Sequence, residues 1–111
     1  MEKTFGVIGG GSWATAIAKM LSNNSSKVNW WIRHEESVEY LKKYKHNDRY
    51  LQAVEFDLTR VHPSSNLEQV VRESDVLVVA IPSAYVFKVF DGFKVEGIEN
   101  KVLFSAIKGI V

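Results

Sequence analysis

Residues 7–16 read Val7-Ile8-Gly9-Gly10-Gly11-Ser12-Trp13-Ala14-Thr15-Ala16, and this stretch decides the fold of the 111-residue chain. The apolar residues just before the glycines, from Thr4 to Ile8, predict a buried strand, and Ser12 is placed to cap a helix that begins there. The small residues follow the spacing G-x-G-x-x-A, with alanine at the third small position. A strand, a glycine turn and a helix in this order are typical of a dinucleotide site, because unpaired N–H groups and the positive end of the helix dipole meet the phosphates there.

Each small residue of this spacing has its own physical task. Gly9 lets the chain turn sharply out of the strand, since a Cβ atom would block the required backbone angles. Gly11 leaves room for a pyrophosphate against the main chain, and Ala14 lets the helix pack close to the strand. We therefore predict that Gly9 and Gly11 belong to a cofactor site.

The composition predicts one small domain with its own core. Apolar residues make up 46% of the chain, and 14 basic against 13 acidic residues leave a net charge of +1. No field of one sign is therefore present to favour a nucleic acid or a membrane surface, and we expect neither partner. Cysteine is absent, and His46 and His62 have no second ligand at metal spacing, so we expect no metal site. The longest apolar run, Val76 to Ile81, is far too short to cross a membrane, and the first residues lack a signal-peptide pattern, so we expect a cytoplasmic protein.

Strand and helix patterns alternate along the whole chain. The expected strands cover residues 4–8, 27–33, 59–62, 76–81 and 101–107. The expected helices begin at Ser12, cover 35–44 and 67–72, and run from Ser83 to Phe90, with residues 63–66 as a loop from which Ser65 or Asn66 caps the third helix. This alternation predicts an α/β fold of the Rossmann type in a single domain over residues 1–111, with a parallel sheet, right-handed crossovers and helices on both faces.

An acidic residue that NAD-binding folds of this type place after their second strand is missing here. It is expected about 20 positions after the glycines, where it accepts hydrogen bonds from the ribose hydroxyls. Arg33 stands 19 positions after Ala14 instead. A guanidinium cannot accept those bonds but can hold a 2′-phosphate, and His34 beside it offers a second donor. The pattern favours NADPH (NADP) over NADH (NAD), with a solvated cation at the strand end as the alternative for Arg33.

Five motifs occur in order along the sequence and together resemble one enzyme family. They are residues 7–16, Trp31-Ile32-Arg33, Asn47-Asp48-Arg49-Tyr50-Leu51, Ile81-Pro82-Ser83 and Ala106-Ile107-Lys108-Gly109-Ile110. Over its whole length the chain resembles the amino-terminal domain of bacterial NAD(P)-dependent glycerol-3-phosphate dehydrogenase. The Gly-Ser-Trp-x-Thr-Ala and Asn-x-x-Tyr-Leu elements carry most of the specificity, because Rossmann proteins in general need neither.

The resemblance implies cofactor contacts at Ser12, Trp13, Arg33, His34 and Tyr50. Ser12 matches a residue that reaches a phosphate, and Trp13 matches one that packs beside the dinucleotide, with ordinary core packing as the alternative. Tyr50 matches a residue near the cofactor, although a buried tyrosine closing the sheet edge would explain it equally.

Three further positions belong to the end of the fourth and fifth expected strands. Pro82 and Ser83 lie where a ligand crevice opens in such sheets, with a helix cap as the alternative for Ser83. Lys108 matches a family lysine that contacts both cofactor and substrate. A cation there would bind substrate and stabilise negative charge on a carbonyl oxygen as hydride arrives, which makes Lys108 the predicted catalytic, cofactor-binding and substrate-binding residue.

The family resemblance also implies a reaction and a place in metabolism. We expect hydride transfer between NAD(P)H and dihydroxyacetone phosphate, giving sn-glycerol 3-phosphate for phospholipid synthesis. Family members continue into a helical carboxyl-terminal substrate domain, so we expect this chain to be a truncated part that binds cofactor without turnover. An exposed sheet edge permits a homodimer. The alternatives are another two-domain dehydrogenase, of 6-phosphogluconate or hydroxyacid type, and a stand-alone nucleotide-binding module.

Overall fold

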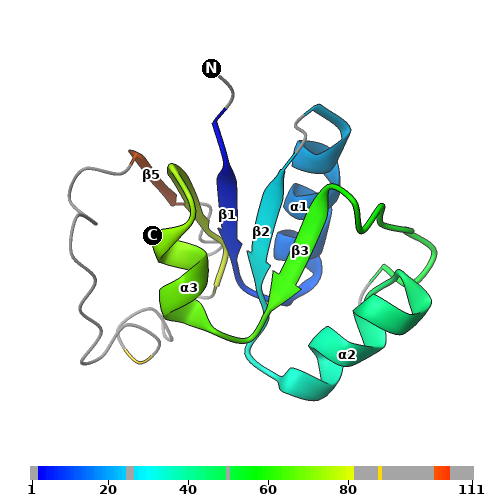
Figure 1. The fold of residues 1–111 in the computed structure, drawn as a ribbon. Helices are drawn as coiled ribbons and strands as arrows, with labels where there is room; N and C mark the ends of the chain where they lie inside the picture. The colour runs from blue at the N-terminus through cyan, green and yellow to red at the C-terminus, as the bar shows by residue number, and fades with distance from the viewer. Residues whose placement is uncertain (1–2, 25–26, 50, 82–87, 89–101, 106–111) are drawn as a thin grey trace.

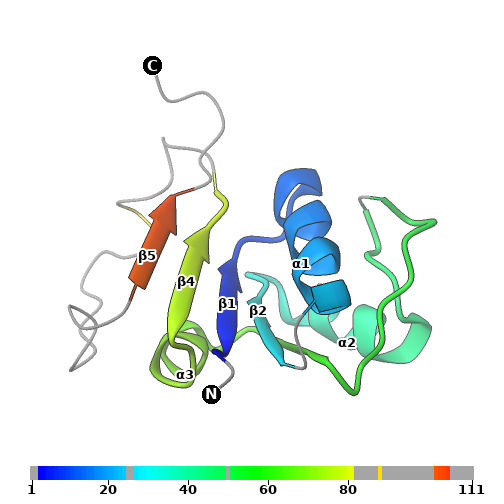
Figure 2. The same cartoon turned by 90° about the horizontal axis from the view of Figure 1, so that it is seen from above.

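Five parallel strands form one sheet with the order β3-β2-β1-β4-β5 (Figures 1 and 2). The computed structural model describes residues 3–24, 27–49, 51–81, 88 and 102–105. The elements are β1 (Phe5–Ile8), α1 (Ser12–Asn24), β2 (Val28–Trp31), α2 (Glu35–Tyr44), β3 (Val61–Ser64), α3 (Leu67–Arg72), β4 (Val76–Val79) and β5 (Val102–Ser105). The predicted parallel α/β fold is therefore confirmed.

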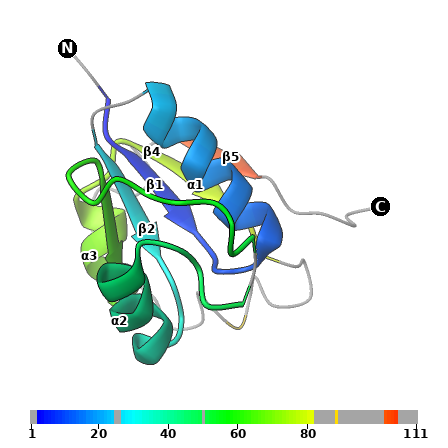
Figure 3. The ribbon, with the colours of Figure 1, turned by 90° about the vertical axis from the view of Figure 1, so that its right-hand side faces the viewer.

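Helices cover both faces of the sheet, as the sequence predicts. The chain first moves outward from β1 to β3 and then crosses back beside β1, so α1 and α3 lie on opposite faces (Figure 3). Successive residues of a strand point to opposite faces. Trp30 accordingly packs into a core with residues of α1 and α2, whereas Trp31 packs into a second core with Val70 and Val71 of α3.

The helices follow the apolar spacing of their sequences. On α1 the residues Ala14, Ile17 and Ala18 are buried, a spacing that places them on one face of the helix. The side chain of Asn66 accepts a hydrogen bond of 3.1 Å from the backbone N–H of Gln69, so Asn66 rather than Ser65 caps α3.

The third strand corrects a prediction. We expected a strand over 59–62 and a loop over 63–66, but β3 spans Val61–Ser64 and includes Pro63. The carbonyl oxygen of Arg60 accepts a bond from Val28 of β2, and that of Ser64 accepts one from Ile32, the residue after β2. The odd-numbered residues 61 and 63 therefore direct their backbone groups away from β2. Because β3 is an edge strand, the missing N–H of Pro63 costs no ladder bond.

Other boundaries differ at the strand ends. β2 ends at Trp31 and β4 at Val79, each two residues before the expected end, and β2 begins at Val28 rather than Lys27. Of the expected strand over 101–107 the structure describes residues 102–105, and all four lie in β5. The helix expected from Ser83 to Phe90 lies outside the described residues, apart from Lys88. Within the described part of the chain, no helix is long and apolar enough to span a membrane.

Candidate functional site

The glycine turn leaves β1 at the carboxyl edge of the sheet, between β2 and β4. The chain proceeds from β1 toward β3 on one side and returns to β4 on the other, and α/β sheets bind ligands at the crevice where this reversal occurs. The fingerprint residues therefore lie at the edge of the sheet where folds of this topology bind ligands.

Gly9 is required by the backbone itself. Its φ is +134°, and a Cβ atom there would lie 2.4 Å from the carbonyl oxygen of Ala80 and 3.0 Å from Cγ2 of Ile81. No side chain fits between the turn and the end of β4, so the predicted conformational role of Gly9 is confirmed.

At Gly11, by contrast, no described part of the protein requires a glycine. A Cβ atom at Gly11 would meet no atom within 4 Å, so the space that it would fill is open. A pyrophosphate lying against the main chain needs such a space, and the turn therefore fits the group that the sequence predicts.

The carbonyl oxygens of the three glycines are all held by the protein. The oxygen of Gly9 accepts from the indole N–H of Trp30 at 2.6 Å, and that of Gly10 accepts from Nδ2 of Asn47 at 3.3 Å. The oxygen of Gly11 accepts from the backbone N–H of Thr15 at 2.9 Å and from its hydroxyl at 2.7 Å.

These bonds also set the direction of the N–H groups that follow. The described peptide bonds are trans, and in a planar trans peptide the N–H points opposite to the carbonyl oxygen. The N–H groups of Gly10, Gly11 and Ser12 therefore point away from Trp30, Asn47 and Thr15, and no described residue accepts from them. The turn therefore has three backbone donors that no described residue uses and that an anion could accept.

Sequence reasoning missed the three side chains that hold this turn. Trp30, Thr15 and Asn47 are buried, with 0%, 0% and 4% of their surface exposed. Thr15 belongs to the Gly-Ser-Trp-x-Thr-Ala motif and Asn47 to the Asn-x-x-Tyr-Leu motif, neither of which Rossmann folds in general need. The signal available in the sequence was the presence of a polar residue, Thr15 or Asn47, within each of these two motifs.

Ser12 and Trp13 open α1 beside these donors. The carbonyl of Gly11 accepts the bond from Thr15, so Gly11 occupies the N-cap position and the expectation that Ser12 caps the helix is wrong by one residue. Trp13 is 51% exposed, which rules out the alternative of core packing.

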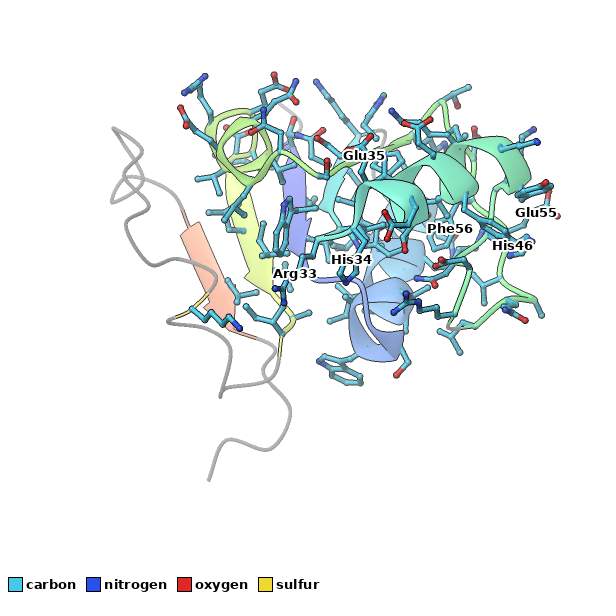
Figure 4. All side chains as sticks on the ribbon, turned by 90° about the horizontal axis from the view of Figure 1, so that it is seen from below. Arg33, His34, Glu35, His46, Glu55 and Phe56 are labelled. Carbon is cyan, nitrogen blue, oxygen red and sulfur yellow. The ribbon has the colours of Figure 1, made fainter. Side chains whose placement is uncertain are left out.

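Arg33 and His34 lie at the same edge, where β2 leads into α2 (Figure 4). Both side chains are exposed, and among the described residues neither has a hydrogen-bond or ion-pair partner. The neighbouring carboxylate of Glu35 accepts a hydrogen bond from the hydroxyl of Ser65 instead. A cation and an imidazole are thus available here to an anionic ligand.

Four predicted positions, Tyr50, Pro82, Ser83 and Lys108, lie outside the described residues. Their roles remain predictions. The strand before Lys108, β5, runs parallel to β4, so its carboxyl end lies at the same edge as the glycine turn.

The described histidines and carboxylates form no metal site. No group of three or more metal-ligating side chains occurs among residues that the structure describes. Nδ1 of His46 lies 3.0 Å from the carbonyl oxygen of Asn47, and His62 is exposed on β3.

Comparison with known proteins agrees with this geometry. The family model described as NAD-dependent glycerol-3-phosphate dehydrogenase N-terminus matches residues 4–111. The chain is 34% identical over 109 residues to the glycerol-3-phosphate dehydrogenase (NAD(P)+) of Pseudomonas paraeruginosa, covering 98% of the chain and 32% of that protein. It thus spans about a third of the length of the curated relatives that it matches.

Solved structures share the fold. Glycerol-3-phosphate dehydrogenase from Saccharomyces cerevisiae superposes with a TM-score of 0.86 at 23% identity, over 98% of this chain and 34% of that one. The Plasmodium falciparum enzyme gives 0.79 at 24% identity, over 94% of this chain and 32% of that one. The chain belongs to the NAD-dependent glycerol-3-phosphate dehydrogenase family and matches its amino-terminal part.

Proposed function

We propose that this chain binds NAD(P)H at the glycine turn as the cofactor-binding part of a glycerol-3-phosphate dehydrogenase. The observation that carries the proposal is the pairing of three outward N–H donors with the open space at Gly11. Family membership selects the enzyme class over the 6-phosphogluconate and hydroxyacid dehydrogenases and over a stand-alone nucleotide module.

Each predicted residue has a place in this proposal. The N–H groups of Gly10, Gly11 and Ser12 receive the pyrophosphate, and the exposed ring of Trp13 packs against the dinucleotide. Arg33 and His34 take the 2′-phosphate of the adenosine ribose, which favours NADPH over NADH. Tyr50 completes the cofactor contacts that the family resemblance implies.

The reaction proposed for the whole protein is the interconversion of dihydroxyacetone phosphate and sn-glycerol 3-phosphate, a supply step for phospholipid synthesis. The nicotinamide, when bound, supplies or accepts the hydride. Lys108 binds the substrate and stabilises the negative charge on its carbonyl oxygen.

The remaining contacts to substrate are proposed to come from the two thirds of the relatives' length that this chain does not match. The chain alone then binds cofactor with little or no turnover, because donor and acceptor must be held together in a closed site. The cytoplasmic location and the homodimer stay predictions.

Calorimetric titration of the chain with NADPH and with NADH, at one ionic strength, tests the proposal. We expect tighter binding of NADPH and loss of that difference in Arg33→Asp. Arg72→Asp is the matched control, since it makes the same charge change in the last turn of α3, which leads to the opposite edge of the sheet. Equal affinities in the unmodified chain would remove the role of Arg33, and absence of binding in a chain with a cooperative unfolding transition would remove the cofactor site.

The enzyme class needs a separate test on the longer protein. Reduction of dihydroxyacetone phosphate by NADPH supports it, whereas oxidation of 6-phosphogluconate or of a hydroxyacid by NADP would support the other dehydrogenases.

A further inference from the structure

We propose that Asn47 is a positioning residue for phosphate binding, which holds the peptide between Gly10 and Gly11 so that the N–H of Gly11 faces the pyrophosphate. The inference rests on the proposed function, because it assigns a role within the same site. It gives a task to a buried residue, of whose surface only 4% is exposed.

The hydrogen bonds of Asn47 fix which way its carboxamide faces. Its Nδ2 donates to the carbonyl oxygen of Gly10 at 3.3 Å and to the hydroxyl of Thr15 at 3.0 Å. Its Oδ1 accepts from the backbone N–H of Arg49 at 2.8 Å. An amide that used its oxygen toward Gly10 would repel that carbonyl, so only one orientation satisfies both sides of the group.

The consequence for the turn follows from peptide planarity. The carbonyl oxygen of Gly10 and the N–H of Gly11 belong to one trans peptide, so pulling the oxygen inward turns the N–H outward. Glycine residues on both sides of this peptide leave it few steric barriers to rotation. A rotated peptide would present a carbonyl oxygen to the phosphates and repel them.

Contacts other than those of the Asn47 side chain hold the segment around residue 47 in place. The carbonyl oxygen of Lys45 accepts from the N–H of Phe56 at 2.7 Å, and the Phe56 ring packs on Trp30 with centroids 5.0 Å apart. Loss of the Asn47 side chain should therefore release the Gly10 carbonyl and leave the fold in place.

Asn29 supplies a closely matched control on the other side of the sheet. It is also 4% exposed, and its Nδ2 also donates to one hydroxyl, that of Ser74 at 3.2 Å, and to one backbone carbonyl, that of Glu73 at 3.4 Å. Asn29→Ala removes equivalent bonds beneath α3, away from the glycine turn.

The first readout is the Kd of NADPH and of NADH for the chain, measured well below the Tm of every variant. Asn47→Ala should raise the Kd of both nucleotides by the same factor of about ten, since one buried polar contact is lost and both ligands carry the pyrophosphate. Asn29→Ala should change either Kd by less than about twofold, although it lowers the Tm comparably.

The second readout follows single N–H groups. Addition of inorganic pyrophosphate to the 15N-labelled chain should shift the amide resonances of Gly10, Gly11 and Ser12. In Asn47→Ala the shift at Gly11 should shrink most, because the Gly10 amide is directed by the bond from Trp30 to Gly9. Equal attenuation at all three amides would indicate general loosening and overturn the assignment to one peptide.

A second pair of variants covers the case in which Asn47→Ala is too unstable to titrate. Thr15→Val removes the hydroxyl that Asn47 and Gly11 share, and Thr15→Ser restores it, so the first should weaken both nucleotides and the second should bind as the unmodified chain does. If the unmodified chain binds and Asn47→Ala or Thr15→Val binds equally well, the positioning role is wrong and the proposed function stands. If the unmodified chain binds neither nucleotide nor pyrophosphate, the proposed function fails and the positioning role fails with it.

Discussion

The indole N–H of Trp30 donates a hydrogen bond of 2.6 Å to the carbonyl oxygen of Gly9, which lies 21 positions earlier in the chain. Trp30 is fully buried in the core that the sheet shares with α1 and α2. A residue of the hydrophobic core therefore bonds directly to the turn at which the phosphates are proposed to bind.

Trp30→Phe tests this connection. The change removes the donor and part of the ring, so we expect the free energy of unfolding to fall by about 2 to 4 kcal/mol and the Kd of NADPH to rise. Trp31→Phe is the control, since its indole N–H donates to the carbonyl of Ser65 at 3.0 Å in the other core. Urea unfolding and nucleotide titration should show a stability loss in both variants but weaker binding only in Trp30→Phe.

Gly9→Ala should damage folding before it affects binding. An alanine would need a φ near +134° and would place its Cβ 2.4 Å from the backbone oxygen of Ala80, the residue after β4. We expect a loss of more than about 3 kcal/mol, seen as a large fall in the urea midpoint. A midpoint close to that of the unmodified chain would mean that the turn has another accessible conformation.

Gly11→Ala should weaken nucleotide binding and leave the fold almost as stable as in the unmodified chain. The new methyl group meets no described atom, so the cost in stability should stay within about 1 kcal/mol, as expected for alanine at an N-cap. The same methyl fills the proposed pyrophosphate space and should abolish most nucleotide affinity. Retained affinity in a calorimetric titration would place the phosphates elsewhere.

Trp13→Ala should weaken binding without weakening the fold. Trp13 is 51% exposed, and Met20 on the same helix is 58% exposed, so both alanine variants should change stability by less than about 0.5 kcal/mol. Only Trp13→Ala should raise the Kd of NADPH. An equal Kd for both variants would show that the indole does not contact the dinucleotide.

Asp57 should contribute to stability at neutral pH and lose that contribution in acid. Hydrogen bonds from the hydroxyl and the backbone N–H of Thr59 hold the pKa of Asp57 below its usual value of 3.8. A carboxyl whose pKa is lower in the folded state stabilises the fold above its unfolded pKa, and the effect disappears as pH falls through the folded pKa. Urea unfolding of Asp57→Asn should therefore differ from the unmodified chain at pH 7 and converge with it below pH 3.8; a constant difference at every pH would exclude the titration.

The local pattern of the sequence is enough to predict the fold, but not to predict the side chains that hold the glycine turn. The glycine spacing and the alternation of elements predicted β1, α1 and a parallel sheet, because these depend on residues near one another in the chain. The bond from Asn47 to Gly10 joins residues 37 positions apart, and nothing local distinguishes this asparagine from one that caps a turn. The sequence alone places Pro63 in a loop, because proline is tolerated within a strand only where that strand lies at the edge of a sheet, and the order of strands is not a local property.

The outer edge of β3 offers no backbone donor to another strand. Two of its residues direct their backbone groups outward: Pro63 has no N–H, and the N–H of Val61 is already donated to the carbonyl of Asp57 at 3.0 Å. Strand addition needs such donors, and proteins guard against unwanted aggregation by removing them. A strand added beside β3 would therefore find carbonyl acceptors but no backbone donor, which disfavours growth of the sheet on this side.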